Sequence, residues 1–411
     1  MDYPDVLDWL YAQLPMFQRS GPVRYRMDLS KTHALCEALG HPEHNLQVVH
    51  IAGTNGKGSV SHAVAAALQE RGLKVGLYTS PHLSDPRERI RIDGQWIGKT
   101  EFVAFVVNHM SLWEQMRPSF FELIFGMALT AFHSHQVDVV VLETGMGGRL
   151  DSTNIFPAPV VTAITSIGLD HQQFLGDDVR SIAGEKAGIL KEGVPCVVGV
   201  LPPEARSVVL EQSMKLGVEV YDGIPASDVQ AGPQWLLRNQ AVARRILSLI
   251  PGQARTDEAV LLAGPAAWGL RGRWQFWDRD CLLDCAHNVE GLTSTGKAVS
   301  ALGRPIRLVF AAVADKDVGK ALSCLPQTAS NHWCSADVPR AMPVDALSRL
   351  ALASGRKGEA HATVAQAVLS ARAQRKDNEL VLILGSVFTV GEALTFLESE
   401  GSGAGASVDP E

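Results

Sequence analysis

A glycine-rich segment that carries one lysine and one hydroxyl lies between a β-branched run and a helical pattern. The segment reads Gly53-Thr54-Asn55-Gly56-Lys57-Gly58-Ser59. Glycines let backbone N–H groups approach phosphate oxygens, and the amino terminus of a following helix adds partial positive charge. Lys57 can reach the outer phosphates of a nucleotide, and Ser59 can ligate magnesium. The order strand, glycine loop, lysine, hydroxyl and helix therefore predicts a triphosphate site.

This segment departs from the common spacing G-x-x-x-x-G-K-[ST]. Gly58 separates Lys57 from Ser59, and Gly53 stands too close to the Gly56-Lys57 pair. The alternative interpretation is a glycine-rich strand-to-helix turn with a solvated lysine. The preceding strand and the amphipathic helix that we expect over residues 62–71 favour the nucleotide site.

A second group of polar residues follows other strand-like runs. Glu143 ends the apolar run 137–142, Ser80 follows the run 75–78, and Asp170-His171 follow a further run. Because parallel strands end at one edge of a sheet, these side chains should converge there. A hard cation that bridges phosphates needs such oxygen ligands. We predict a magnesium site, the alternatives being an ordinary acidic strand end and a structural histidine.

Lys186 interrupts an apolar helical stripe. In the helix expected over residues 181–191, Lys186 shares one face with Ile182, Ile189 and Leu190. One interpretation is a lysine whose stem packs while its amine reaches water. The other is an amine buried in the site.

The same runs indicate the fold class. Strands expected at 48–52, 75–78, 137–142, 160–165 and 195–200 alternate with helical stretches, and a second series follows at 281–284, 306–310 and 380–384. This alternation predicts an α/β protein in which an N-terminal P-loop domain with a mostly parallel sheet precedes a smaller C-terminal Rossmann-like α/β domain. Three tryptophans and two glycines in 268–277 suggest a connector. We expect domains at 1–271 and 272–400 and a disordered tail at 401–411.

Composition limits the kind of partner. The 411 residues carry a net charge of −7, so no general positive field would hold nucleic acid or an acidic membrane. The six cysteines form no CxxC pair, which is typical of a reducing compartment. The acidic start lacks signal-peptide character, and no apolar run approaches the roughly 18 residues of a membrane span. We expect a cytoplasmic protein that acts on small molecules.

Several segments, taken in order, resemble the folylpolyglutamate synthase/dihydrofolate synthase family of Mur-ligase-like ATP-dependent ligases. The resemblance covers nearly the whole chain. Its segments are 53–59, 79–83, 88–90, 142–154, 170–171, 185–189, 272–275, 284–288 and 315–317.

The resemblance implies roles for particular residues. ATP would contact Thr54, Asn55, Gly56, Lys57, Gly58, Ser59, Asn239, Arg273, Asp284 and His287. Two magnesium ions would be held by Ser59, Ser80, Glu143 and His171, and Lys186 would carry a carbamate, so that Lys57, Lys186 and His171 are the catalytic candidates. The pterin substrate would lie near Tyr25, Arg26, Met27, Ser119, Phe120, Phe121, Glu122, Leu150, Asp151 and Ser152. For Phe120 and Phe121 an equal alternative is helix core.

The activity implied by the resemblance is ATP-dependent ligation of L-glutamate. The acceptor would be dihydropteroate, the γ-carboxylate of folylglutamates, or both, through an acyl phosphate, and the enzyme would act as a monomer whose connector is a hinge. Another Mur-type ligase is a rival, although the loop at Gly53 leaves no room for a preceding UDP-binding domain. A non-catalytic nucleotide switch is the second rival. Departures at Leu237-Arg238, Val289 and Phe388 concern the adenine and glutamate contacts.

Overall fold

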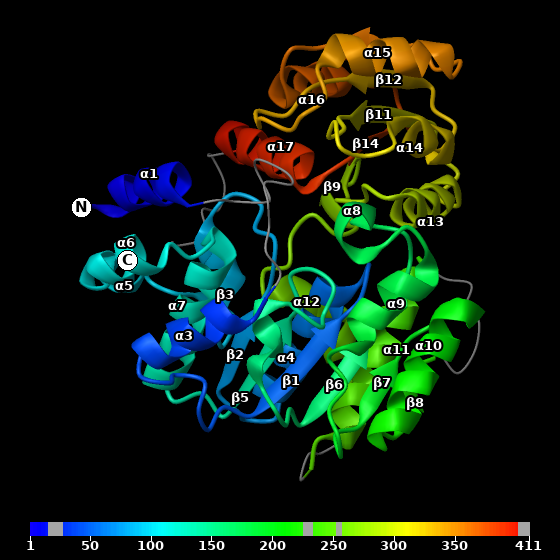
Figure 1. Ribbon diagram of the computed structural model, residues 1–411. Coiled ribbons are helices and arrows are strands. Elements are labelled where there is room, and N and C mark those ends of the chain that lie inside the picture. The colour runs from blue at the N-terminus through cyan, green and yellow to red at the C-terminus, as the bar shows by residue number, and fades with distance from the viewer. Residues whose placement is uncertain (15–27, 225–232, 252–256, 402–411) are drawn as a thin grey trace.

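The chain forms two α/β units, each built on its own sheet (Figure 1). The computed structural model describes residues 1–14, 28–224, 233–251 and 257–401. Tyr25, Arg26 and Met27, and all of the expected tail except Gly401, lie outside the described residues. Within the described residues, no helix combines the length and the apolar character needed to cross a membrane.

The first sheet has eight strands in the order β4-β3-β2-β5-β1-β6-β7-β8. It is parallel except for β3 and β4, which form an antiparallel hairpin beside β2. The mostly parallel sheet expected from the sequence is therefore confirmed. The bounds are β1 Val48–Ala52, β2 Val75–Tyr78, β3 Ile90–Ile92, β4 Gln95–Trp96, β5 Val139–Glu143, β6 Val161–Ile164, β7 Cys196–Val198 and β8 Val220–Asp222.

Alternate residues of the central strands bury two separate apolar faces. In β5, Val140 and Leu142 pack on one side, and Val139 and Val141 pack on the other. A strand buried on both faces reads as a continuous apolar run, which is why β1 and β5 were visible in the sequence. The first face is covered by α1 Tyr3–Gln13, α3 Ser30–Ala38, α5 Lys99–Asn108, α6 Met110–Met116 and α7 Phe120–Ser134. The second is covered by α4 Lys57–Glu70, α11 Gln234–Leu249 and α12 Glu258–Ala267.

Helix α4 differs from the expectation. It begins at Lys57 rather than His62, because Gly56 adopts a left-handed conformation (φ 85°) that turns the chain directly into the helix. All its residues from Ser59 to Leu68 are buried, since α11 and α12 pack on the side away from the sheet. The amphipathic pattern was therefore the wrong description of a helix buried on all sides.

The remaining elements of this half are helices and 3-10 turns. The helix expected over 181–191 is shorter, spanning α9 Val179–Ala187, and Ile189 and Leu190 follow it in the same apolar cluster. The other elements are the helices α8 Gln172–Leu175 and α10 Pro203–Leu216 and the 3-10 turns η1 Pro86–Arg89 and η2 Ser152–Ile155. Of these turns, η1 contacts β3 and β4, and η2 contacts α7.

The second sheet has six strands in the order β13-β12-β11-β14-β10-β9, all parallel except β9. Its bounds are β9 Gln275–Asp278, β10 Cys281–Leu283, β11 Ile306–Phe310, β12 Ser330–Trp333, β13 Glu359–Ala360 and β14 Leu380–Leu384. The helices are α13 Val289–Ser300, α14 Val318–Cys324, α15 Val344–Ala353, α16 Val364–Ala373 and α17 Val387–Glu400. We propose to divide the chain at 271/272, between α12 and β9, and below we call the two parts the amino-terminal and carboxyl-terminal halves.

Candidate active site

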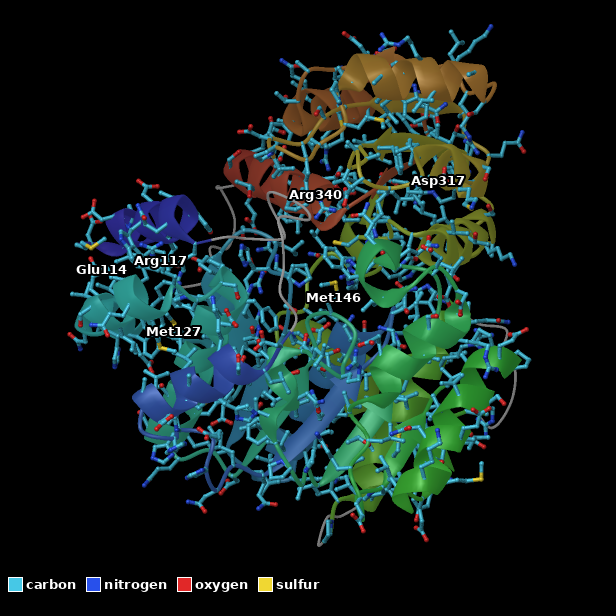
Figure 2. All side chains as sticks on the ribbon, viewed as in Figure 1. Glu114, Arg117, Met127, Met146, Asp317 and Arg340 are labelled. Atoms are coloured by element: carbon cyan, nitrogen blue, oxygen red, sulfur yellow. The ribbon has the colours of Figure 1, made fainter. Side chains whose placement is uncertain are left out.

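One cavity of about 340 Å³ lies between the halves and is lined by both. Met146 lines it from the amino-terminal half and Arg340 from the carboxyl-terminal half, and Figure 2 shows these two labelled side chains on either side of the gap between the ribbons. The carboxyl ends of β1, β2, β5 and β6 supply the loops on the first side. This is the edge at which open α/β sheets bind ligands.

The glycine loop after β1 is tightly enclosed. A Cβ at Gly53 would lie 2.0 Å from the Thr165 hydroxyl, and one at Gly56 would lie 2.3 Å from the Asn239 side-chain oxygen. Both glycines also have positive φ, 155° and 85°. The loop therefore needs glycine at both positions, and Asn239 of α11 lies directly against it.

Lys57 folds back over its own loop. Its amine donates to the carbonyls of Gly53 (3.2 Å) and Thr54 (3.4 Å) and lies 3.9 Å from Oε1 of Glu143. An amine held at the start of a helix is suited to bind phosphate oxygens. The structure thus places Lys57 at the wall of the cavity, where the sequence predicts a phosphate site.

Glu143 is 4% exposed at the end of β5. Its Oε2 accepts a hydrogen bond from the Ser80 N–H (3.2 Å), and its Oε1 lies beyond hydrogen-bond distance of Lys57. Burial raises the pKa of Glu143, and Lys57, the Ser80 N–H, Arg273 and Arg89 oppose that rise. A buried carboxylate with lone pairs still available fits a magnesium ion. Ser59, Ser80 and His171 line the same cavity.

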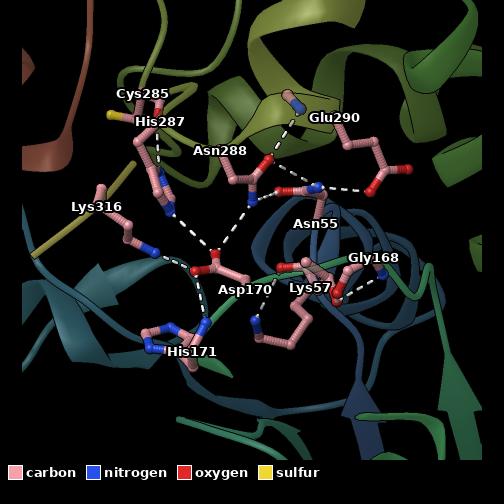
Figure 3. Close-up of polar contacts among 12 residues, drawn as sticks. Asn55, Lys57, Gly168, Asp170, His171, Cys285, His287, Asn288, Glu290 and Lys316 are labelled. Carbon is pink, nitrogen blue, oxygen red and sulfur yellow. Dashed lines mark hydrogen bonds and ion pairs between the residues drawn. The ribbon is translucent and has the colours of Figure 1, made fainter. Parts of the chain in front are cut away.

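Asp170 is the centre of a polar network that joins the two halves (Figure 3). Its Oδ2 accepts from His287 Nε2 (3.3 Å) and Asn288 Nδ2 (3.1 Å), and its Oδ1 pairs with the Lys316 ammonium. Burial alone would raise the pKa of Asp170, but His287, His171 and Lys316 hold it well below its usual value. Asp170 is therefore an ionised link across the cleft.

His171, the next residue, has a left-handed backbone (φ 50°), and its N–H donates to Oδ1 of Asp170 (2.8 Å). Burial lowers the pKa of His171 to about 4, with Asp170 opposing the shift and Lys316, His287 and Lys57 adding to it. The imidazole is therefore neutral near pH 7, which is the form that ligates a metal.

Asn55 makes a second bridge, from the glycine loop to α13. Its Nδ2 donates to Oε2 of Glu290 (3.0 Å), and its Oδ1 accepts from Asn288 Nδ2 (3.0 Å) (Figure 3). The glycine loop is thus in direct contact with the carboxyl-terminal half.

Lys186 is buried, with 3% of its surface exposed, and its amine donates to the Gly53 carbonyl (2.8 Å). The interpretation of a lysine whose amine reaches water is therefore wrong. Burial and the charge of Lys57 lower the pKa of Lys186 to about 7, and Asp170 and Asp151 oppose the shift. The amine lines a small cavity of about 20 Å³ together with Lys57, Asp170 and His171.

The residues predicted to contact ATP from the far side also line the main cavity: Asn239, Arg273, Asp284 and His287. Asp284 is fixed by three donors, the N–H groups of Trp274 (2.8 Å) and Ala286 (2.9 Å) and the Thr295 hydroxyl (3.3 Å). Burial tends to lower the pKa of Arg273, but Cys285, Asp284 and Glu143 raise it. Arg273 stays charged between two carboxylates.

The residues predicted for the pterin divide into two groups. Ser119, Phe120, Phe121, Leu150 and Asp151 line the cavity. Glu122 and Ser152 do not. Glu122 closes a capping box at the start of α7, accepting from the Ser119 N–H (2.6 Å), and Ser152 is buried in η2. Phe120 belongs to the core, as one interpretation has it, and also lines the cavity, so its contact with the pterin stays a prediction.

Sequence reasoning left several residues of the site without a role. Arg89, Glu290, Lys316 and Arg340 line the cavity, and Asn288 donates to Asp170 beside it. Two local signals were available. Asn288 is the N-cap of α13 and accepts from the Gly291 N–H (2.9 Å), and Lys316 lies in the Asp-Lys-Asp segment after β11. Their positions at the site depend on contacts between the halves, and local sequence patterns do not encode such contacts.

Comparison with known proteins agrees with this geometry. The family model described as "Mur ligase, glutamate ligase domain" matches residues 272–387. The Bacillus subtilis dihydrofolate synthase/folylpolyglutamate synthase is 32% identical over 95% of this chain and 98% of its own length. The E. coli FolC structure in complex with DHPP and ADP superimposes with a TM-score of 0.84 at 27% identity, covering 98% of this chain and 99% of that one. A bifunctional folylpolyglutamate synthase/dihydrofolate synthase with Mn, AMPPNP and L-glutamate bound gives a TM-score of 0.83 at 27% identity, covering 97% and 98%. The chain belongs to the dihydrofolate synthase/folylpolyglutamate synthase family of ATP-dependent ligases.

Proposed function

We propose that the chain joins L-glutamate to dihydropteroate, to the γ-carboxylate of folylglutamates, or to both, with conversion of ATP to ADP and phosphate, in folate biosynthesis. The observation that carries this proposal is the single cavity in which the glycine loop, Glu143 and the aromatic wall at Phe121 meet. The bound DHPP, ADP, AMPPNP and L-glutamate of the related structures support it.

The chemistry begins with transfer of the γ-phosphoryl group of ATP to the substrate carboxylate. The bond from the γ-phosphorus to the bridging oxygen breaks, and an acyl phosphate and ADP form. The glutamate amine then attacks the acyl carbon, phosphate departs, and the excess proton passes to water. Lys57 and the loop N–H groups stabilise the negative charge on the phosphoryl oxygens. Arg273, between Asp284 and Glu143, orients the nucleotide from the other half.

Magnesium ions are the proposed cofactor. Ser59, Ser80, Glu143 and His171 would hold them, because hydroxyl, carboxylate and neutral imidazole groups gather at one end of the cavity. A bound magnesium ion neutralises phosphate charge and fixes the phosphates in position for in-line transfer. We propose two ions, as the family resemblance implies.

We further propose that Lys186 carries a carbamate. A neutral amine attacks carbon dioxide, an N–C bond forms, and one proton is released, which leaves an anionic oxygen group. The burial of Lys186 and its pKa of about 7 favour the neutral amine that this step needs. The group would meet the small cavity that Lys186 shares with Lys57, Asp170 and His171.

Two rival functions remain to be tested against this one. A different Mur-type amide ligase would use the same phosphate chemistry with another acceptor, so the aromatic wall with Asp151 is the feature that favours a pterin. A nucleotide switch would need neither the buried carboxylate of Glu143 nor the buried amine of Lys186, both of which interact with Lys57. The six cysteines are unpaired, which fits the reducing cytoplasm that we propose as the location, and we propose a monomer.

The test is a phosphate-release assay on the purified chain with ATP, magnesium and L-glutamate. Dihydropteroate, tetrahydrofolate and a UDP-muramyl substrate are compared as acceptors. We expect release with one or both of the first two, dependent on glutamate. Phosphate release only with the UDP-muramyl substrate would show a different Mur-type ligase. Nucleotide binding without phosphate release would show a nucleotide switch.

A further inference from the structure

Three buried side chains, joined by hydrogen bonds, link the middle of β1 to the cavity wall. His50 Nε2 lies 2.8 Å from the Thr153 hydroxyl, and that hydroxyl lies 2.6 Å from Oδ1 of Asp151. His50 and Thr153 are fully buried, and Asp151, 6% exposed, lines the main cavity. His50 and Thr153 have no part in the chemistry described above.

The hydrogen-bond network shows which group donates and which accepts at each step between these three side chains. Asp151 accepts at Oδ1 from the N–H (3.0 Å) and the hydroxyl of Thr153, and at Oδ2 from the Met146 N–H (2.8 Å). A hydroxyl has one proton to donate, and that of Thr153 is directed to Asp151. The contact with His50 therefore requires an N–H at Nε2, which fixes the tautomer of the imidazole.

The other nitrogen of His50 shows that this arrangement costs stability. Nδ1 is buried and has no hydrogen-bond partner within the part of the chain that the structure describes. A buried polar atom without a partner destabilises a fold, and such atoms call for a physical explanation. Burial, with Lys191, lowers the pKa of His50 to about 3, so the ring is neutral and its single proton stays at Nε2.

Asp151 and Phe121 adjoin the same backbone position. A Cβ at Gly145 would lie 2.5 Å from the Phe121 ring and 3.1 Å from Oδ2 of Asp151. An aromatic face next to a buried carboxylate is suited to a flat ring with N–H donors on one edge. The amino group and ring N–H of a pterin form such an edge.

We propose that His50 and Thr153 are positioning residues that hold Asp151 as an oriented, acceptor-only carboxylate for the donor edge of the pterin ring. This inference rests on the proposed function, because it assumes a pterin-bearing substrate. Burial raises the pKa of Asp151, and the hydrogen bonds from Thr153 and from the Met146 N–H oppose that rise and favour the ionised carboxylate. His50 keeps the Thr153 hydroxyl from turning away. A purely structural role, in which the same bonds only fasten η2 to β1, is the alternative.

The experiment compares isosteric and conservative variants of the full chain by steady-state kinetics. Thr153→Val removes the hydroxyl and keeps the shape, and we expect KM for dihydropteroate to rise about tenfold, as for loss of one hydrogen bond to a charged group. KM for ATP and KM for glutamate should stay within about twofold of wild type. Thr153→Ser keeps the hydroxyl and should restore KM for dihydropteroate.

The histidine is tested in the same way. His50→Leu should raise KM for dihydropteroate in the same direction, and His50→Gln, which retains a donor, should recover it in part. Thr162→Val is the matched control. Thr162 lies opposite His50 on β6, is fully buried, and donates to the Pro195 carbonyl (3.3 Å), so its loss removes a buried hydroxyl without touching Asp151.

A double variant isolates the coupling. If Thr153 acts through Asp151, then Thr153→Val should add nothing to Asp151→Asn. Additive losses, or an equal rise of all three KM values in Thr153→Val, would overturn the proposal in favour of a structural role. Should Thr153→Val not fold, the His50→Gln and His50→Leu pair decides by the same criterion. A wild-type chain that turns over neither dihydropteroate nor a folate would instead defeat the proposed function.

Discussion

The polar residues at the strand ends of the two sheets differ in how far their hydrogen-bonding capacity is already used. Glu143, on the first sheet, accepts a hydrogen bond from the Ser80 N–H. Asp284, on the second sheet, accepts three, from Trp274, Ala286 and Thr295. Both carboxylates are buried. Since a carboxylate offers about four acceptor positions, Glu143 retains more of them for a cation than Asp284 does.

The lysines show the same difference. Lys186, in the amino-terminal half, is buried beside another amine, and its pKa is lowered to about 7. Lys316, in the carboxyl-terminal half, is paired with Asp170 across the cleft. Glu143 and Lys186 of the amino-terminal half therefore keep bonding capacity for a ligand, whereas Asp284 and Lys316 of the carboxyl-terminal half are already paired within the site. We infer that the amino-terminal half performs the phosphoryl chemistry and the carboxyl-terminal half positions the nucleotide.

The largest effect should follow from Lys57→Ala. The variant removes a cation from the phosphate end of the cavity, and we expect turnover to fall by about a hundredfold to a thousandfold. Stability should change little, because the hydrogen bonds of the amine go to its own loop, where Lys186 still donates to the Gly53 carbonyl, and its ion pair with Glu143 is long, at 3.9 Å. Phosphate release and thermal unfolding measure the two. Near-normal turnover would exclude Lys57 from the phosphate site.

Lys186→Ala should also be nearly inactive, because the proposed carbamate would be lost. A small carboxylate such as acetate should restore part of the activity by filling the vacated space. Lys186→Arg should not recover, since a guanidinium stays positively charged and cannot carry a carbamate. The mass of the side chain in active, bicarbonate-supplied enzyme gives the direct answer, and an unmodified amine there would refute the carbamate.

The pH dependence of stability tests the burial of Lys186 independently of activity. Its pKa of about 7 in the folded chain lies below the ordinary 10.5, so between these values the unfolded chain binds a proton that the folded chain does not. Stability attributable to Lys186 therefore rises with pH across this window. In carbon dioxide-free buffer, the free energy of unfolding should rise with pH in wild type relative to Lys186→Met, by at most about 1.4 kcal/mol per pH unit. Parallel profiles would show an amine with an ordinary pKa.

Glu143→Gln should act mainly on magnesium. The amide keeps the shape of the strand end but lacks the charge that a hard cation prefers. We expect the magnesium concentration for half-maximal rate to rise at least about tenfold. Asp284→Asn is the matched control from the other sheet, and it should change KM for ATP while leaving the magnesium dependence alone. The opposite pattern would reverse our assignment of the two halves.

The sequence predicted best what depends on local pattern. β1, β2, β11 and β14 have the bounds that their apolar runs indicated. The glycine loop, Glu143 and His171 do line one cavity, because parallel strands end at one edge. Glu122, predicted for the pterin site, closes a capping box and does not line the cavity. The local signal was present, because Ser119-x-x-Glu122 is the pattern of a capping box.

What the sequence did not predict depends on distant contacts or on short elements. Asn288 and Lys316 meet Asp170 across 118 and 146 residues, so no window of the sequence joins them. The strands β8 and β9 are short and only partly buried, and β13 is exposed, so all three lack the apolar runs that reveal central strands. The start of α4 was missed because Gly56 and Gly58 lie at its first turn, and glycine disfavours helix formation.

The smallest effect should come from the bridge between the halves. Asn288→Ser keeps an oxygen that can cap α13 but removes the amide that donates to Asp170 (3.1 Å) and Asn55 (3.0 Å). Two hydrogen bonds across the cleft are lost while each half keeps its own core, so we expect unchanged thermal stability and a rise of about twofold to tenfold in KM for ATP. Small-angle scattering should show a larger radius of gyration in the nucleotide-free variant, with nucleotide restoring the wild-type value, since the phosphates would again draw Asn55 and the carboxyl-terminal half together. An unchanged radius with an unchanged KM would mean that Lys316 and His287 hold the cleft closed without Asn288.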